Sequence, residues 1–464
     1  MHELPQPAFD PGLIEKYGGE GPRYTSYPTA VNFSEDFGPD QYAHAVADSN
    51  SLPMPADLSV YVHVPFCASP CFYCACNRVI TRSPVAGDQF LDTLGKELAL
   101  VAPRFDRDRR LRQLHLGGGT PTFLTPDQID RLMSMLRDHF SFADDAELGL
   151  EVDPRTVDAA AIARLADAGF NRISVGVQDL DAQVQAAINR VHNAATVGAV
   201  IKAAQDSGFS SISVDLIYGL PLQTAASFSD TIDQMVAMGP DRLSLFNYAH
   251  LPHLFKAQRQ IRADQLPAAE DKLDIFRTSL LRLLEAGYEF IGMDHFARPD
   301  DSLVKAKKDG SLMRNFQGYS THGGLDMVSF GPSAISHVGD SFAQNHRGLD
   351  EWAISVTESR LPVARGLTRN TDDCIRADVI ESIMCRARVE FAALERDYEL
   401  VFKRYFSPEL EQLAPLAADG LVVIDDRGLQ VTDSGLLFLR AIARHFDAWL
   451  APAGETRGRF SRIV

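Results

Sequence analysis

Four of the six cysteines in this 464-residue chain lie between positions 67 and 76. Cys67, Cys71, Cys74 and Cys76 follow the segment YVHVPF, whereas Cys374 and Cys385 lie far downstream. We expect the chain in a reducing compartment, where a disulfide knot does not persist. The cluster of thiols therefore indicates a metal or redox site.

The first three cysteines have the spacing C-x3-C-x2-C, which suits an iron–sulfur cluster. Three thiolates on one tight loop can hold three corners of a 4Fe-4S cube, whose electron-transfer form takes four cysteines. One iron is then left open for another ligand. Cys76 stands only one residue beyond Cys74, which makes it hard for both sulfurs to reach different corners of one cube.

Two other kinds of site remain open from the residues alone. A structural zinc site usually draws on two separated pairs of ligands, so ten contiguous residues would have to fold sharply around the ion. A dithiol redox pair at Cys71 and Cys74 has the C-x-x-C spacing but leaves Cys67 without a role. A zinc-stabilised binding protein is therefore an alternative to an enzyme.

The cysteines begin where a predicted strand, LSVYVHV, ends at Pro65. Apolar, β-branched runs alternate after it with stretches of helical periodicity. The further strands are QLHLG, LGLEVD, RISVGVQ, SISVDLIYG, RLSLFNYA and YEFIGMDHF, and the helices are expected at 87–103, 126–140, 157–168, 194–208, 225–238 and 268–286. Six or seven such units predict an α/β fold, a partial or complete parallel TIM-like β/α barrel with its chemistry at the carboxyl ends of the strands.

The pattern divides the chain into three regions. Residues 1–55 contain scattered Pro and Gly and predict an extended N-terminal arm that covers something. Residues 56–365 form the predicted catalytic barrel, and residues 366–464 a smaller, mostly helical domain. That domain is expected to have helices at 372–390 and 407–418, a hairpin turning at Asp425–Gly428, and a final helix at 433–449.

Helices followed by a hairpin are typical of a winged helix, which suggests DNA binding. The hairpin carries Asp425, Asp426 and a single arginine, however, and contacts with phosphate need more positive charge. A domain that packs against the barrel is the alternative.

Composition narrows the classes of function. A hydrophobic fraction of 45% supports a sizeable core. A net charge of −17 disfavours nucleic acid as a partner. No stretch approaches the ~20 apolar residues that span a bilayer, and the start MHELPQPAFD lacks the features of a signal peptide, so we expect a cytoplasmic protein without a membrane partner.

The C-x3-C-x2-C motif after the first strand of a β/α barrel resembles the radical S-adenosylmethionine (SAM) superfamily, in which the open iron chelates the amino and carboxylate groups of SAM. Within it the chain resembles, over nearly its full length, the oxygen-independent coproporphyrinogen III oxidases (dehydrogenases). The extra Cys76 and the arm segment Pro22–Thr29 carry this narrower match. Related haem chaperones share the three cysteines but lack both features, and they form the alternative within the superfamily.

The resemblance implies a 4Fe-4S cluster on Cys67, Cys71 and Cys74, and two molecules of SAM. It assigns Tyr61, Gly118, Glu151 and Ile335 to the first SAM, and Gly119, Thr120, Gln178, Arg190, Asp215 and Ala249 to the second. Tyr73 stands where the family usually has Phe before the third cysteine, and either ring can stack on an adenine.

Each of these residues also has a plainer interpretation. Gly117–Gly119 suits an ordinary tight turn, and Glu151 a solvated charge at the rim of the barrel. An Arg and an Asp near strand ends, such as Arg190 and Asp215, often form an ion pair with each other. Core packing is the default for Tyr61 and Ile335.

The family activity implied is the anaerobic oxidative decarboxylation of two propionates of coproporphyrinogen III to vinyl groups, which gives protoporphyrinogen IX in haem biosynthesis. A 5′-deoxyadenosyl radical from SAM would abstract the hydrogen, so we name no catalytic acid or base. The resemblance implies an external one-electron donor, and we expect a monomer. Because the substrate carries four propionates, cations are needed near it, and Arg23, Arg298 and Arg314 are candidates, although each suits the surface equally well.

Overall fold

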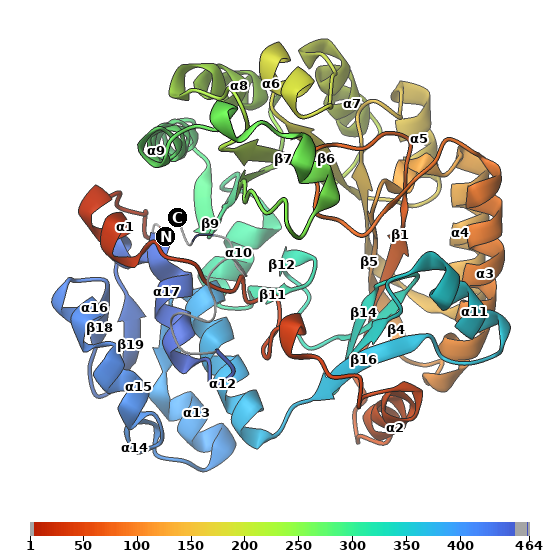
Figure 1. Ribbon diagram of the computed structural model, residues 1–464. Coiled ribbons are helices and arrows are strands. Elements are labelled where there is room, and N and C mark those ends of the chain that lie inside the picture. Colours follow the sequence, from red (N-terminus) through yellow and green to blue (C-terminus); the bar gives the residue numbers. More distant parts are fainter. Residues whose placement is uncertain (1–3, 451–461, 463–464) are drawn as a thin grey trace.

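The computed structural model describes residues 4–450 and 462. Within this part of the chain the largest element is a 12-stranded sheet with the order β16-β15-β14-β13-β1-β4-β5-β6-β7-β8-β10-β9 (Figure 1). Its strands are β1 (Leu58–Val64), β4 (Arg110–Gly118), β5 (Ser141–Val152), β6 (Arg172–Gln178), β7 (Ser211–Tyr218), β8 (Arg242–Asn247), β9 (Glu289–Gly292), β10 (His295–Ala297), β13 (Asp326–Phe330), β14 (Ile335–Val338), β15 (Ser341–Asn345) and β16 (Val363–Thr368).

The six strands from β1 to β8 in this order run parallel and alternate with helices, as predicted. Val60, Val62 and Val64 of β1 are fully buried, and side chains of this size stabilise the fold by roughly 1.5–3 kcal/mol each when they leave water. The intervening helices are α3 (Val85–Val101), α4 (Pro126–His139), α5 (Ala159–Asp167), α6 (Ala182–Ala187), α7 (Ala194–Asp206), α8 (Ala225–Met238) and α9 (Ala269–Glu285). Because the described strands leave two edges, β9 and β16, the barrel is partial.

A seventh parallel unit was expected at YEFIGMDHF, and that prediction is wrong. The chain reverses within this run, so that β9 and β10 form a hairpin and β10 lies antiparallel to β8. Met293 has a φ of 51°, which places the turn inside the apolar run. On the other side β13 is parallel to β1, and β14 to β16 continue the sheet in antiparallel pairs.

Three further elements flank the barrel. Helices α10 (Ser302–Asp309) and α11 (Leu349–Thr357) and the small hairpin β11 (Met313–Asn315) and β12 (Gly318–Ser320) come from the segments between its later strands. No helix of the described residues is both long and apolar enough to cross a bilayer.

The helices of the C-terminal region are shorter than predicted. The helix expected at 372–390 is α12 (Thr371–Glu381), which ends in a π-helical turn before strand β17 (Arg388–Glu390). The hairpin is confirmed as β18 (Val422–Ile424) and β19 (Gly428–Val431), and β17 adds a third strand to it. Helices α13 (Phe391–Tyr398), α14 (Phe402–Tyr405), α15 (Ser407–Gln412) and α16 (Ala414–Ala418) lie between.

The prediction of one continuous final helix at 433–449 is wrong. This segment is a 3-10 turn at 433–438, the short α17 (Leu439–Ala443) and a second 3-10 turn at 444–446. Residues 435–443 are all buried, so packing on every side decides the backbone there, and Phe438 leaves the helical region at φ −110° and ψ 18°. Residues 451–461 and 463–464 of the expected domain lie outside the described residues.

We expected an extended N-terminal arm, but the arm is helical in two places. It contains α1 (Pro11–Tyr17), whose first amides are capped by the Asp10 side chain, and α2 (Pro39–Asn50), which contacts β14 to β16. Between these helices the chain passes along the C-terminal domain and the open side of the sheet (Figure 1). Arg440 Nε of α17 donates to the Pro22 carbonyl at 2.9 Å, so the arm is held from the C-terminal side.

Candidate active site

The cysteine loop leaves β1 at Pro65 and is closed at its base by a small parallel pair of strands. These are β2 (Phe66–Cys67) and β3 (Val79–Ile80). Val79 N donates to the Pro65 carbonyl at 2.6 Å, and Thr81 N to the Cys67 carbonyl at 3.0 Å. The loop therefore begins and ends at one fixed point beside the carboxyl end of β1.

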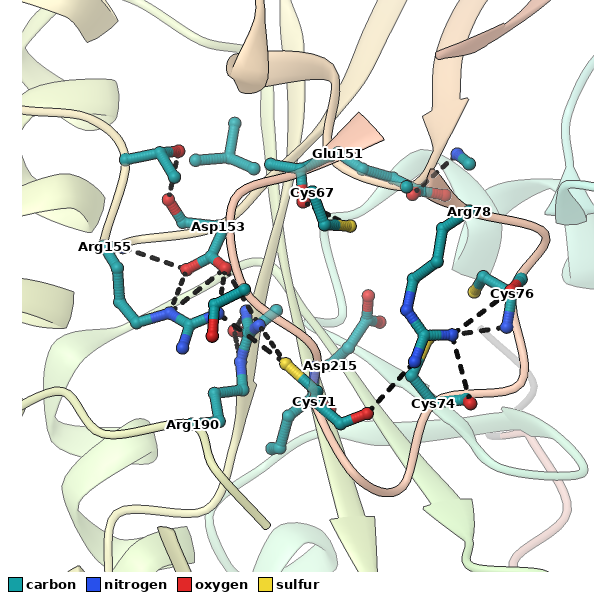
Figure 2. Close-up of a pocket in the computed structure, with 18 of the residues that line it drawn as sticks. Cys67, Cys71, Cys74, Cys76, Arg78, Glu151, Asp153, Arg155, Arg190 and Asp215 are labelled. Carbon is teal, nitrogen blue, oxygen red and sulfur yellow. Dashed lines mark hydrogen bonds and ion pairs between the residues drawn. The ribbon is translucent and has the colours of Figure 1, made fainter. Parts of the chain in front are cut away.

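Arg78 holds the inside of this loop together (Figure 2). Its guanidinium donates to the carbonyls of Cys71, Cys74 and Cys76 at 3.2, 3.3 and 3.3 Å. The loop is also fixed from outside, because Asn189 Nδ2 donates to the Pro70 carbonyl at 2.7 Å. Sequence reasoning missed Arg78, although a basic residue two positions past Cys76 was a signal for it.

The glycine segment at the end of β4 packs directly on the start of the loop. Gly119 N donates to the Val64 carbonyl at 2.8 Å, and a Cβ at Gly119 would lie 2.7 Å from the Phe66 carbonyl oxygen. Any larger residue would push the two segments apart. The adjacent Thr120 hydroxyl lies 3.3 Å from Cys67 Sγ.

A cavity of about 530 Å³ opens at these strand ends. Figure 2 shows the cysteines of the loop around it, together with Glu151 and Asp215 from the barrel strands and Asp153, Arg155 and Arg190 from connecting segments. The residues predicted from sequence that line it are Cys67, Cys71, Cys74, Tyr73, Gly118, Gly119, Thr120, Glu151, Gln178, Arg190 and Asp215.

A second cavity of about 380 Å³ adjoins the first. Tyr61 and Ile335 line this second cavity and not the first. Gly118, Glu151 and Cys76 line both, so the two cavities meet at these residues. The residues assigned by resemblance to a first and to a second SAM thus fall largely on two adjoining cavities.

Of the residues assigned to the second SAM, Asp215 lies further inside its strand than expected, whereas Ala249 lies just past its strand, as expected. Asp215 lies within β7, paired with Gly176 and Ser244, and reaches the first cavity from inside the barrel. Its carboxylate accepts a hydrogen bond from Ser174 Oγ at 2.9 Å, and burial raises its pKa. Ala249 is half-buried two residues past β8 and is not among the described residues that line either cavity.

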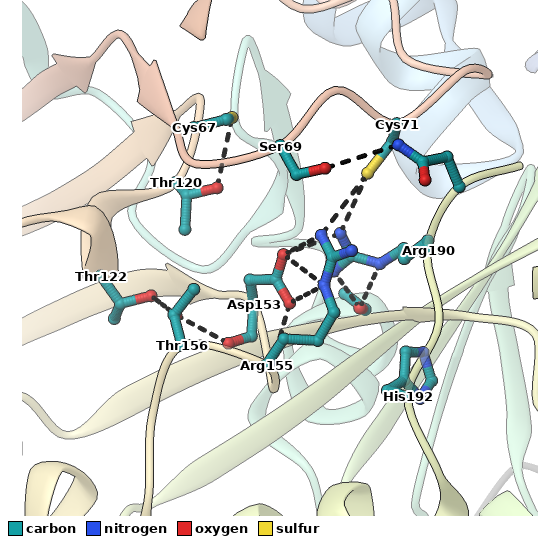
Figure 3. A network of polar contacts seen from close by, with 12 residues as sticks. Cys67, Ser69, Cys71, Thr120, Thr122, Asp153, Arg155, Thr156, Arg190 and His192 are labelled. Atoms are coloured by element: carbon teal, nitrogen blue, oxygen red, sulfur yellow. Dashed lines mark hydrogen bonds and ion pairs between the residues drawn. The ribbon is translucent and has the colours of Figure 1, made fainter. Parts of the chain in front are cut away.

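Arg190 does not pair with Asp215, the ion pair considered from sequence. It donates to Asp153 Oδ2 at 2.9 Å, and Arg155 Nη2 donates to the same oxygen at 2.6 Å (Figure 3). Burial raises the pKa of Asp153, but the hydrogen bond from Arg155 and the charge of Arg190 hold it below its usual value. Sequence reasoning missed Asp153 and Arg155, which follow β5 directly.

The thiols differ in their surroundings. Hydrogen bonding with the Cys76 side chain lowers the pKa of Cys74 to about 6, whereas burial raises the pKa of Cys67. Cys71 is buried, and Arg155 and Arg190 donate to its sulfur at 3.6 and 3.5 Å. The lowered pKa of Cys74 favours thiolate there, the form that binds metal.

The donor set fits an iron–sulfur cluster better than a single metal ion. Four thiols, three of them in the C-x3-C-x2-C spacing, and no imidazole line the cavity, and thiolate is the ligand type of such clusters. Across residues 4–450 and 462, no three His, Cys, Asp or Glu side chains converge as one metal ion requires. A zinc ion would need its ligands to meet within a tetrahedron, whereas a cube of four irons spaces them more widely.

The three arginines that were candidates for binding the substrate lie in different places. Arg298 lies at the opposite end of the sheet, because its amide donates to the Asp241 carbonyl just before β8 begins, and this overturns its assignment. Arg23 forms an ion pair with the buried Asp294. Arg314 is buried, and its Nε donates to the Arg23 carbonyl at 3.3 Å, so Arg314 lies against the arm next to Arg23.

Comparison with known proteins identifies both parts of the chain. Residues 61–235 match the Radical SAM superfamily, and residues 370–438 match the HemN C-terminal domain. The chain is 48% identical to the oxygen-independent coproporphyrinogen III oxidase of Salmonella typhimurium and 47% identical to that of Escherichia coli, in both cases over 98% of each chain.

A relative from Pseudomonas aeruginosa with the same name is 45% identical over 98% of this chain and 99% of its own. The solved structure of coproporphyrinogen III oxidase from Escherichia coli, described as a radical SAM enzyme, superposes with a TM-score of 0.92 at 46% identity. That match covers 96% of this chain and 100% of the other. The comparisons do not support the haem-chaperone alternative.

Proposed function

The chain belongs to the oxygen-independent coproporphyrinogen III oxidases of the radical SAM superfamily, and on this premise we propose that it converts coproporphyrinogen III to protoporphyrinogen IX. Two propionate side chains of the substrate lose carbon dioxide and become vinyl groups, a step of haem biosynthesis. The observation that carries the proposal is the three-thiol loop facing a cavity at the carboxyl ends of parallel strands.

Cys67, Cys71 and Cys74 are the residues that would hold a 4Fe-4S cluster. When bound, the cluster with SAM supplies a 5′-deoxyadenosyl radical, using one electron from an external donor. The chain's own task is to position the reactants and to exclude water. Arg78 contributes by fixing the carbonyls of the loop, and thereby the directions of the thiols.

Two SAM molecules are proposed to occupy the two adjoining cavities. Tyr61, Glu151 and Ile335 would contact the first molecule in the smaller cavity. The larger cavity would hold the second, with Thr120, Gln178, Arg190, Asp215 and the ring of Tyr73 on its walls. Arg190 is suited to a carboxylate because its guanidinium carries fixed positive charge beside the cavity. Ala249 is retained as a contact only through the resemblance.

The substrate is proposed to lie beneath the N-terminal arm, where Arg23 and Arg314 can meet its propionates. The ion pair of Arg23 with Asp294 would fix the direction of this cation before substrate arrives. The segment Pro22–Thr29 passes over the open side of the sheet and would limit the access of water and oxygen to the radical. We further propose a monomer in the reducing cytoplasm, with no nucleic-acid partner.

The test is an anaerobic incubation of the purified protein with dithionite, SAM and coproporphyrinogen III, followed by chromatography of the porphyrins and nucleosides. We expect vinyl products together with 5′-deoxyadenosine and methionine. A Cys71→Ala variant, which removes one proposed ligand, is expected to give neither product above background. Stoichiometric haem binding without turnover of substrate would contradict the proposal.

A further inference from the structure

The sulfur of Cys71 is contacted by two guanidinium groups. Arg155 Nη2 lies 3.6 Å and Arg190 Nη1 3.5 Å from Cys71 Sγ, and both nitrogens are hydrogen-bond donors (Figure 3). Cys67 and Cys74 have neutral partners instead, the Thr120 hydroxyl and the Cys76 amide. Among the described residues, Cys71 is thus the one thiol of the three with hydrogen bonds from guanidinium groups, whereas the charge of Arg78 acts on Cys67 and Cys74 without such a bond.

One carboxylate holds both arginines in place. Asp153 accepts from Arg155 Nε at 2.9 Å and Nη2 at 2.6 Å, and from Arg190 Nη1 at 2.9 Å. The side chains of Asp153 and Arg190 are 7% exposed, and that of Arg155 is 23% exposed. Because two cations share one anion, a net positive charge faces the buried sulfur, and little water is present to screen it.

The position of Arg155 is set by the turn that follows β5. The Arg155 amide donates to Asp153 Oδ1 at 3.0 Å, and the Thr156 amide and hydroxyl both donate to the Asp153 carbonyl at 2.9 Å. The guanidinium then folds back on the same carboxylate. This local arrangement aims Arg155 at Cys71 independently of any ligand in the cavity.

We propose that Arg155 raises the reduction potential of the cluster held by Cys67, Cys71 and Cys74. Reduction brings one electron from the external one-electron donor and transfers no atom, so it adds one negative charge to the group bound at these sulfurs. Hydrogen bonds to cysteine sulfur and nearby net charge are the means by which a protein shifts such potentials. Arg155 stabilises the reduced form, and this makes the cluster easier to reduce.

This inference rests on the proposed function, because it requires the cluster to bind at these cysteines. Arg155 and Arg190 both line the larger cavity, but the resemblance assigns only Arg190 to the second SAM. Removal of Arg155 therefore tests the charge at Cys71 while leaving the proposed carboxylate contact of Arg190 in place.

The experiment is an EPR-monitored redox titration of anaerobically reconstituted protein without SAM, so that the readout is the midpoint potential and not the activity. The variants are Arg155→Gln, Arg155→Lys and, as a matched control, Arg82→Gln. Arg82 is exposed on the outside of the same loop and donates to the Ala68 carbonyl at 3.3 Å. The control thus removes the same charge from the loop without removing a donor to sulfur.

We expect Arg155→Gln to shift the midpoint to a more negative value than in the parent protein, with Arg155→Lys between the two. Arg82→Gln should stay close to the parent. Iron and sulfide are measured in every sample, and potentials are compared at equal cluster content. An unchanged midpoint in Arg155→Gln, or an equal shift in Arg82→Gln, would overturn the inference.

A variant that changes the local charge in the opposite direction separates an effect of charge from a disturbance of the hydrogen bonds around Asp153. Asp153→Asn keeps the size of the side chain but removes its negative charge, so the net positive charge near Cys71 grows, and the midpoint should become less negative. A shift in the same direction as Arg155→Gln would contradict a charge effect. If the parent protein binds no cluster at all, the proposed function fails; a cluster with an unaltered potential refutes only the role of Arg155.

Discussion

At the scale of single residues, each of the three thiols has a polar partner of its own. The Thr120 hydroxyl lies near Cys67, two guanidinium groups near Cys71, and the Cys76 amide near Cys74 at 3.4 Å. Hydrogen bonds and positive charge stabilise a thiolate relative to the neutral thiol. The fourth cysteine of the loop therefore acts on a ligand without needing to be one.

This arrangement predicts opposite outcomes for two neighbouring cysteines. Cys74→Ala should lose the cluster, because only two of the three proposed ligand sulfurs remain. Cys76→Ala should keep iron and sulfide close to the parent content, because its contact with Cys74 is a hydrogen bond and no corner of the cube depends on it. Chemical iron and sulfide determination after anaerobic reconstitution measures both. Equal loss of iron in the two variants would show that Cys76 is itself a ligand.

At the scale of elements, the parallel half of the sheet could be predicted and the antiparallel half could not. Runs such as RISVGVQ form strands that are buried at alternate positions and have a capped helix before and after them, so the local sequence predicts both their periodicity and their boundaries. Strands β14 to β16 are short and exist through pairing with one another and with β13. Such pairing depends on distant residues and leaves no local period.

The same division holds for the site. The cysteine loop and the glycine segment were found because each follows a predicted strand, and Glu151 because it lies near the end of one. The partnership of Arg190 with Asp153 joins residues 37 positions apart, and only the fold brings them together. Arg298 was misplaced because it follows an apolar run, which turned out to contain a chain reversal.

Helix α3 is joined to the sheet by one buried carboxylate. Glu97 accepts hydrogen bonds from Gly331 N at 2.8 Å, Asn345 Nδ2 at 2.7 Å and Trp352 Nε1 at 3.0 Å. Gly331 begins the turn after β13, and this turn leads to Ile335 on the wall of the second cavity. Burial raises the pKa of Glu97 to about 7, from an ordinary value of 4.5.

The raised pKa of Glu97 predicts a pH dependence of stability. Between the two pKa values the folded chain holds a proton that the unfolded chain has released, so raising the pH through this window favours unfolding. The free energy lost is about 3 kcal/mol at most, because a tenfold change in proton affinity corresponds to roughly 1.4 kcal/mol. We expect the free energy of unfolding of the parent, relative to Glu97→Gln, to fall from pH 5 to pH 8 in urea titrations. A difference that stayed constant or grew with pH would contradict this.

At the scale of the whole molecule, the N-terminal arm contacts both the barrel and the C-terminal domain. Tyr24 Oη donates to Asp447 at 3.0 Å in the C-terminal region, whereas Arg23 pairs with Asp294 from the barrel. Ser34 forms an antiparallel bridge with Gly366, where β16 ends the sheet. The C-terminal domain thus reaches the substrate side of the barrel through the arm, although it contributes no residue to the lining of the larger cavity among the described residues.

Arg440 contributes two hydrogen bonds to this connection, because its buried guanidinium donates to Pro22 O at 2.9 Å and to the Gly21 carbonyl, and it also donates to Arg462 O at 2.8 Å. Arg440→Met keeps the volume but leaves these carbonyls without their donor, at a cost of about 1–3 kcal/mol for each one that stays buried. We expect faster amide hydrogen exchange over residues 20–28, measured by mass spectrometry, and a higher KM for coproporphyrinogen III. Exchange in α3, which lies outside this contact, should not change.

Arg427→Met, which removes an exposed arginine at the hairpin tip, is the matched control and should leave the exchange rates of the arm unchanged. If the arm exchanged no faster in Arg440→Met than in this control, the C-terminal domain would not be what holds the arm over the site.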